Sequence, residues 1–182
     1  MKFVYQRIGK EEDERAAGRS LLIDALNDLG IKASAEDIEV DSLGKPYLSG
    51  SVGVEFNLTH KNGMVACILS TGEGRVGIDA EPSEGAVKES HVERFVKKYF
   101  SDNEACAMRE GKRSFSEIWT RKEAYFKLIG CGIGSDMHSF DTEEVEGVHF
   151  HTYSIDGFTV TVATENEAEI FFSEKNDHLY CN

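Results

Sequence analysis

The stretch Val76-Gly77-Ile78-Asp79-Ala80-Glu81-Pro82 predicts a strand with two different faces. Its apolar residues alternate with Gly77, Asp79 and Glu81, and side chains two positions apart lie on the same face of a strand. Pro82 keeps the residue before it extended and ends the strand. We therefore expect one face to enter a core and the other to present two carboxylates together. An ordinary half-exposed strand with two solvated acids would have the same pattern.

This strand ends the first of two similar segments of the chain. Three residues recur 94 positions later: Val54, Phe56 and Gly63 correspond to Val148, Phe150 and Gly157. Each segment would contain two strands joined by a turn, at Asn62-Gly63 and at Asp156-Gly157, followed by a third strand. Asn-Gly and Asp-Gly between alternating apolar segments are strong signals for a hairpin.

Helical patterns precede each set of strands. They run roughly from Glu11 to Leu29 in the first segment and, in pieces, from Lys88 to Ile129 in the second. We therefore predict an α+β fold of two related α/β halves with pseudo-twofold symmetry. The halves would be residues 1–84 and 85–182, each with a small antiparallel sheet and packed helices.

The last helical piece begins near Ser114, where Ser114 and Glu117 have the spacing of a capping box. Ser101 and Glu104 have the same spacing at the start of the preceding piece. Lys122 falls in the apolar stripe of the last helix. Its stem could extend past the aromatic residues towards solvent, or its ammonium could meet a buried phosphate.

Glu123 and Lys127 flank that stripe one turn apart. They could form a simple helix-stabilising ion pair. Together with Asp79 and Glu81, however, they supply three carboxylates and a lysine. Mg²⁺ prefers oxygen ligands and completes its shell with water and substrate phosphate. The four residues are therefore candidates for a Mg²⁺ site that acts on a phosphate ester.

The composition is that of a folded protein with an excess of acid: 182 residues with a formal net charge of −13. This charge argues against nucleic acid as a partner. Residues 88–127 are locally basic, with ten Lys and Arg against seven Asp and Glu; they could receive an acidic partner or be solvated helix faces. No apolar run has the length of a membrane span. Four scattered cysteines suggest reduced thiols, so we expect a cytoplasmic protein.

Several motifs occur together in a fixed order. They are Gly44-Lys45-Pro46, Asn57-Leu58-Thr59-His60, Gly77-Ile78-Asp79-Ala80-Glu81, and Trp119-Thr120-Arg121-Lys122-Glu123-Ala124-Tyr125-Phe126-Lys127 with Gly130-Cys131-Gly132. In order and spacing, from about Gly44 to Phe140, the chain resembles the 4′-phosphopantetheinyl transferase superfamily, and within it the surfactin-synthetase-activating (Sfp-like) type.

The resemblance implies an enzyme that transfers the phosphopantetheine arm of coenzyme A to a serine of an apo acyl or peptidyl carrier protein. The other product would be adenosine 3′,5′-bisphosphate. Two other functions remain open: a non-catalytic module that binds coenzyme A or a carrier protein, and an unrelated Mg²⁺-dependent phosphohydrolase.

The resemblance also implies roles for individual residues. Asp79, Glu81 and Glu123 match the acids that hold Mg²⁺, or Mn²⁺ in its place, against the pyrophosphate. Glu123 is also the candidate base for the serine hydroxyl, and Lys127 the residue that neutralises the leaving phosphate. Expected coenzyme A contacts come from Lys45, Pro46, Thr59, His60 and Lys122, with Arg15 and Arg19 of the first helix as further cationic candidates.

The carrier protein is itself acidic, so we expect it to approach the basic stretch of a monomeric enzyme. Lys97, Lys98, Lys112 and Arg113 are the candidates for this contact. Salt screening over about 8 Å lets a local patch outweigh the charge of the whole chain.

Overall fold

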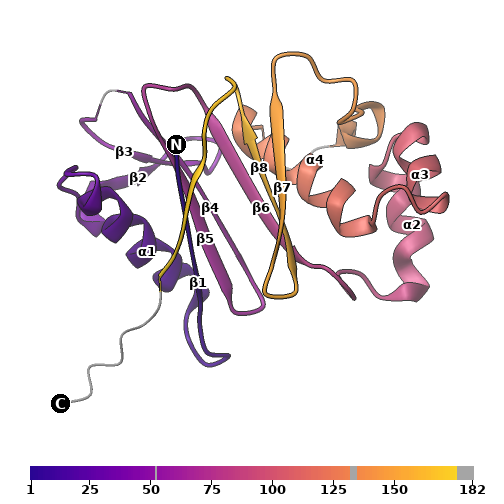
Figure 1. Cartoon of the computed structure of the whole chain (residues 1–182), viewed down its shortest axis with the longest axis horizontal. Helices are drawn as coiled ribbons and strands as arrows, with labels where there is room; N and C mark the ends of the chain where they lie inside the picture. The colour runs from indigo at the N-terminus through magenta and orange to yellow at the C-terminus, as the bar shows by residue number, and fades with distance from the viewer. Residues whose placement is uncertain (52, 132–134, 176–182) are drawn as a thin grey trace.

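The structure, a computed structural model, describes residues 1–51, 53–131 and 135–175. Its fold is α+β, as expected (Figure 1). The α-helices are α1 (Glu14–Asp28), α2 (Glu89–Tyr99), α3 (Asp102–Arg109) and α4 (Phe115–Ile129), with 3₁₀ turns at η1 (Ala35–Asp37) and η2 (Ser135–Ser139). The strands are β1 (Lys2–Arg7), β2 (Ile38–Val40), β3 (Pro46–Leu48), β4 (Val54–Lys61), β5 (Met64–Thr71), β6 (Val76–Pro82), β7 (His149–Ile155), β8 (Phe158–Thr164) and β9 (Phe171–Glu174).

Both predicted hairpins are present. β4 and β5 are joined at Asn62-Gly63, and β7 and β8 at Asp156-Gly157. All four turn residues have a positive φ, between 47° and 79°. Glycine adopts this region readily, and Asn and Asp tolerate it better than most other residues. The order of two hairpin strands and a third strand therefore occurs twice, as β4-β5-β6 and β7-β8-β9.

The third strand of each set lies in the sheet of the other set. The four-stranded sheet has the order β4-β5-β1-β9, and the three-stranded sheet has the order β6-β8-β7. The expectation that each half has its own antiparallel sheet is therefore wrong: β6 pairs with β8, and β9 pairs in parallel with β1. Sheet membership does not follow the expected boundary between residues 84 and 85, and the pseudo-twofold symmetry remains a prediction.

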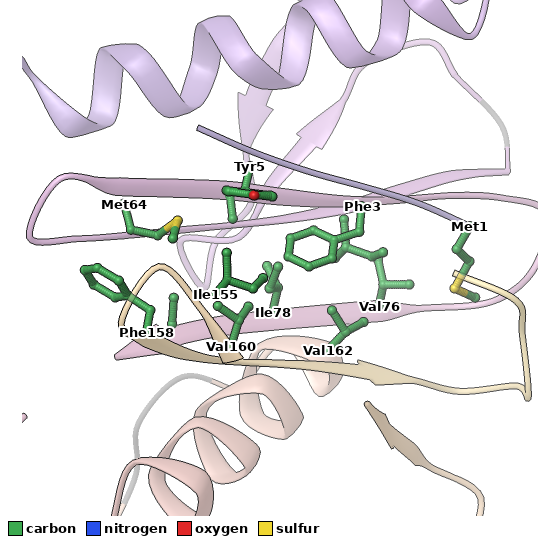
Figure 2. Packing of buried hydrophobic residues seen from close by; sticks show 13 residues of the cluster. Met1, Phe3, Tyr5, Met64, Val76, Ile78, Ile155, Phe158, Val160 and Val162 are labelled. Atoms are coloured by element: carbon green, nitrogen blue, oxygen red, sulfur yellow. The ribbon is translucent and has the colours of Figure 1, made fainter. Parts of the chain in front are cut away.

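The main core fills the space between these two sheets (Figure 2). Phe3 and Tyr5 of β1 face Ile78 of β6 and Val160 of β8 across it, and all four side chains are buried. Val76, Ile78 and Ala80 form the apolar face that the alternation predicted. Because the strands that face each other come from both ends of the chain, folding joins the two segments in one core.

Helices cover the outer faces of both sheets (Figure 1). Leu22 and Leu26 of α1 pack on the four-stranded sheet. On the opposite side of the molecule, Ala124 and Leu128 of α4 pack against Ala163 of β8. α2 and α3 lie beyond α4 and bury the aromatic stripe of that helix. Among the described residues, no helix combines the length and the apolar character needed to cross a bilayer.

Both predicted capping boxes are formed. Ser114 Oγ accepts from the Glu117 amide at 3.1 Å, and the Ser114 amide donates to the Glu117 carboxylate at 2.6 Å. Ser101 and Glu104 make the same reciprocal pair at the start of α3. These bonds satisfy amide groups that an α-helix leaves without partners in its first turn. The sequence therefore predicted where α3 and α4 begin.

Candidate active site

The polar face of β6 points towards α4. Asp79 and Glu81 lie on this face and are 6% and 7% exposed, although they are carboxylates. Gly77 precedes them on the same face. A Cβ atom built on Gly77 would lie 2.0 Å from the carbonyl oxygen of Ala124 in α4. The glycine therefore lets the backbone of α4 lie directly against β6, next to the two acids.

This close packing brings the acid pair against the lysine of the helix motif. Lys127 Nζ donates to Asp79 Oδ1 at 2.7 Å and to the carbonyl oxygen of Ile78 at 3.0 Å. The predicted proximity of the strand motif and the helix motif is therefore present for Asp79 and Lys127. These two residues are 48 positions apart in the chain.

A second row of side chains reaches the same face from β4. Asn57 Oδ1 accepts from the Ile78 amide at 3.2 Å, Thr59 Oγ1 donates to Asp79 Oδ1 at 3.3 Å, and Lys61 Nζ donates to Glu81 Oε1 at 2.9 Å. These three residues of β4 are two positions apart and share a face. They connect the edge strand of one sheet to the edge strand of the other.

Glu123 lies on α4, one turn before Lys127, and completes the acidic group. Burial raises the pKa of Glu123 to about 7, and the negative charges of Asp79 and Glu81 also raise it. The positive charges of Lys127 and Lys61 act in the opposite direction and lower this pKa. The pKa of Glu81 is also raised, chiefly by burial, while its hydrogen bond from Lys61 opposes the change. The negative charge of Asp79 thus acts on both glutamates, which places all three carboxylates in one part of the site.

The donor set fits a hard divalent cation. Asp79 Oδ2 and Glu81 Oε2 are buried and have no hydrogen-bond partner, and such an oxygen is costly unless a cation or donor meets it. In the conformation described, however, no three His, Cys, Asp or Glu side chains of residues 1–51, 53–131 and 135–175 are grouped tightly enough to hold a metal ion. Lysines neutralise Asp79 and Glu81 instead.

The turn that carries Lys45 and Pro46 lies beside this group. Both residues line a pocket of about 240 Å³ together with Asn57, Lys127 and Gly130. Gly130 ends α4 in the left-handed conformation, with φ of 76°. The structure thus brings Lys45 and Pro46, two of the expected coenzyme A contacts, to the same pocket as Lys127. Gly132, another residue of the motif, lies outside the described residues.

Lys122 is not available to a phosphate. Its side chain is fully buried, and its ammonium lies 2.8 Å from Glu104 Oε2. The same nitrogen donates to the carbonyl oxygens of Met137 and Phe140. Because these groups use all three of its donors, neither role suggested by the sequence agrees with the structure. Lys122 instead connects α4 to α3, to η2 and to the residue that follows η2.

The remaining candidates lie outside the acidic group. His60 follows Thr59 on β4 and therefore faces the other side, where its Nδ1 is 3.3 Å from Glu14 of α1. Arg15 and Arg19 are exposed on α1, which covers the far face of the four-stranded sheet. Their contact with coenzyme A remains a prediction.

Two residues of the site, Asn57 and Lys61, were not predicted from the sequence. Asn57 stands inside a quoted motif but received no role, and Lys61 follows that motif directly. The alternation of side chains along a strand could have pointed to both residues, because Asn57 and Lys61 lie two positions before and after Thr59 and therefore on the same face. What the sequence did not reveal is that this face meets β6.

The sequence of this chain is similar to those of known proteins. The sequence model of the 4′-phosphopantetheinyl transferase superfamily matches residues 75–180. This range includes both acids of β6 as well as Glu123 and Lys127.

Several individual proteins are also similar. 4′-Phosphopantetheinyl transferase AcpT of Salmonella typhi is 31% identical over 150 residues, which cover 81% of this chain and 74% of the relative. 4′-Phosphopantetheinyl transferase HetI of Nostoc sp. is 31% identical over 126 residues, which cover 64% of this chain and 52% of the relative. A 4′-phosphopantetheinyl transferase of Bacillus subtilis is 24% identical over 150 residues, which cover 81% of this chain and 66% of the relative. The chain thus spans about half the length of the Nostoc relative. Because the sequence model matches more than half of the chain, the chain belongs to the 4′-phosphopantetheinyl transferase superfamily.

Proposed function

We propose that this protein is a holo-carrier-protein synthase of the surfactin-synthetase-activating (Sfp-like) type. It transfers the 4′-phosphopantetheine arm of coenzyme A to a serine hydroxyl of an apo acyl or peptidyl carrier protein. The serine oxygen forms a bond to the pantetheine-side phosphorus of the pyrophosphate, and the bond from that phosphorus to the bridging oxygen breaks. Adenosine 3′,5′-bisphosphate leaves.

Glu123 is the group that accepts the proton of the serine hydroxyl. The observation that carries the proposal is the position of Glu123 beside the Asp79–Lys127 pair, where burial raises its pKa to about 7 in the metal-free protein. A general base is most effective when its pKa lies near the working pH. In the metal-free protein a substantial fraction of Glu123 is ionised at neutral pH, and the rest becomes ionised as the pH rises.

Lys127 and the remaining acids have complementary roles. Lys127 lines the same pocket as Lys45 and Pro46 and places a positive charge there, where it neutralises the leaving phosphate. Asp79, Glu81 and Glu123 would hold Mg²⁺, or Mn²⁺ in its place, and the two unpartnered carboxylate oxygens support this assignment. When bound, the metal would stabilise negative charge on the pyrophosphate oxygens.

The carrier protein would dock on α2. Lys97 and Lys98 lie near the C-terminal end of this helix and form no ion pair with any described residue, whereas Lys112 and Arg113 are already paired with Glu110 and Glu143. The inner side of α2 supports the choice: its Phe95 ring packs 4.6 Å from Trp119 of α4. Of the four expected docking residues, Lys97 and Lys98 are therefore the ones free to meet an acidic partner.

The location and assembly of the protein are also part of the proposal. We infer a monomeric cytoplasmic enzyme, supported by the free thiols of Cys67, Cys106 and Cys131; Cys181 lies outside the described residues. The formal net charge of −13 supports partners other than nucleic acid or a membrane surface.

The direct test is mass spectrometry of several apo carrier proteins after incubation with coenzyme A and Mg²⁺. We expect one carrier to gain the mass of a single phosphopantetheine arm and adenosine 3′,5′-bisphosphate to appear in equal amount. Coenzyme A binding with no adduct on any carrier would favour a non-catalytic module. Release of inorganic phosphate without carrier modification would favour a phosphohydrolase.

A further inference from the structure

Lys61 is a charged residue of the site that neither the motifs nor the proposed reaction uses. It is the last residue of β4, and its ammonium donates to Glu81 Oε1 at 2.9 Å. Glu81 is nearly buried, with 9% of its side chain exposed, whereas 41% of the Lys61 side chain is exposed. The acid is therefore fixed inside the site, and the lysine reaches it from the solvent side.

The charges of the site explain why a lysine is needed there. Three carboxylates at 79, 81 and 123 lie close together, and like charges in a buried place repel strongly. Lys127 neutralises Asp79 and Lys61 neutralises Glu81. Without Lys61, Glu81 would be a buried carboxylate with no described cation at hydrogen-bond distance.

The two lysines differ in how firmly they are held. Lys127 donates to the Ile78 carbonyl as well as to Asp79, and 28% of its side chain is exposed. For Lys61 the described structure gives a single partner, Glu81, and a more exposed side chain. Moving Lys61 away from its acid therefore breaks one hydrogen bond and returns the ammonium to water.

We propose that Lys61 is the internal counter-ion of Glu81 in the metal-free protein and that it competes with a divalent cation for this carboxylate. The inference rests on the proposed function, because that function requires the cation. Binding of the cation to Glu81 displaces the Lys61 ammonium towards solvent. The ion thus has to replace an existing ion pair, which lowers its affinity and keeps the acidic group neutralised until it arrives.

The test is direct binding of Mn²⁺ alone, followed by electron paramagnetic resonance of the free ion, with Mg²⁺ as a competitor. We expect the variant Lys61→Met to bind Mn²⁺ roughly tenfold or more tightly, since removal of one nearby positive charge relieves repulsion of a divalent ion. Lys61→Arg keeps the charge and should bind as weakly as the unmodified protein. The matched control is Lys2→Met, because Lys2 pairs with Asp28 at 3.0 Å, outside the site.

A second measurement covers the case in which Lys61→Met is less stable. The rise in melting temperature on adding Mg²⁺ should be larger for Lys61→Met than for the unmodified protein. An ion that binds only the folded state stabilises it more when it binds more tightly. Equal or weaker Mn²⁺ binding by Lys61→Met would overturn the proposal. The proposal would also be overturned if Lys61→Arg bound Mn²⁺ as tightly as Lys61→Met, or if Lys2→Met increased the affinity for Mn²⁺ by the same factor.

The Mn²⁺ binding measurement tests the role of Lys61, and the carrier assay tests the proposed transfer, so the two proposals can be refuted independently. If no variant binds Mn²⁺, the competition is refuted whether or not the protein modifies a carrier. If Mn²⁺ binds with the expected order of affinities but no carrier is modified, the counter-ion role of Lys61 is supported and the proposed transfer is refuted.

Discussion

The backbone of Gly77 lies against the Ala124 carbonyl of α4 without room for a side chain. This contact decides how near α4 can come to β6, and therefore how near Lys127 comes to Asp79. The candidate site can therefore form only because residue 77 has no Cβ atom.

Gly77→Ala should destabilise the protein. The added carbon would meet backbone atoms, which cannot turn aside as a flexible side chain can, so the helix and strand must separate. We expect a loss of about 2–3 kcal/mol or more in the free energy of unfolding, the cost typical of overpacking. The measurement is urea unfolding.

The matched control for this prediction is Gly18→Ala in α1. Gly18 is also buried, but a Cβ atom there would meet nothing within 4 Å. Alanine is the better helix former, so this variant should be more stable by up to about 1 kcal/mol. Equal stability of the two variants would contradict the close contact at Gly77.

The Lys122–Glu104 pair should behave as a unit. Removing one partner of a buried ion pair commonly costs about 3–5 kcal/mol, because the other charge is left behind. We therefore expect Lys122→Met and Glu104→Gln each to be strongly destabilising, and the double variant to lose clearly less than the sum. A double-mutant cycle by urea unfolding measures this coupling, and strict additivity would argue against the pair. Folded Lys122→Met should still bind coenzyme A.

Glu123 should make the stability of the metal-free protein depend on pH. Its pKa rises from 4.5 to about 7 on folding, so the folded protein holds this proton more tightly than the unfolded chain. The stabilisation is complete below pH 4.5 and is lost as the pH rises through 7. The glutamine of Glu123→Gln has no proton to lose, so the stability of this variant should not fall as the pH rises through 7.

At pH 8 in the presence of a chelator, Glu123→Gln should therefore be more stable than the unmodified protein by roughly 1–3 kcal/mol. Near pH 4.5 the two should be nearly equal. Thermal unfolding at both pH values is the measurement, with Glu36→Gln, at an exposed glutamate, as control. The same stability difference at both pH values would contradict the raised pKa.

Asp79→Asn should reduce transfer of phosphopantetheine while leaving the fold intact. The amide oxygen can still accept from Lys127, but the negative charge for the cation is lost. Loss of one such charged contact commonly lowers the rate by 10²–10³. Steady-state transfer to the best carrier measures it, and Asp28→Asn, which removes the surface partner of Lys2, should remain fully active. An active Asp79→Asn would remove this residue from the metal site.

Reversing the charge on α2 should weaken recognition of the carrier. Lys97→Glu with Lys98→Glu should raise KM for the carrier roughly tenfold at low salt, with little change in KM for coenzyme A. The difference should shrink as salt is added. Lys32→Glu, at an exposed site beyond α1, is the control. An unchanged KM for the carrier would place docking elsewhere.

The site could be predicted only in part, and the reason is visible in single residues. Asp79 and Lys127 were paired through two motifs, and the structure brings them to 2.7 Å. Lys122 belongs to the same helix motif, yet its partner is Glu104, the acid of the neighbouring capping box. The sequence predicted the cap, but it could not predict that the same carboxylate would also meet a buried lysine.

What the sequence determined by itself was local. The turns at Asn62-Gly63 and Asp156-Gly157, the starts of α3 and α4, and the two-faced pattern of β6 all depend on neighbours within a few positions, so backbone preference and side-chain spacing suffice to predict them. Only the tertiary structure decided that β6 pairs with β8, that β9 pairs with β1, and that Lys61 meets Glu81. These contacts join residues that are 20 to 169 positions apart, and their partners are chosen by the burial of one shared core, which no short stretch of sequence encodes.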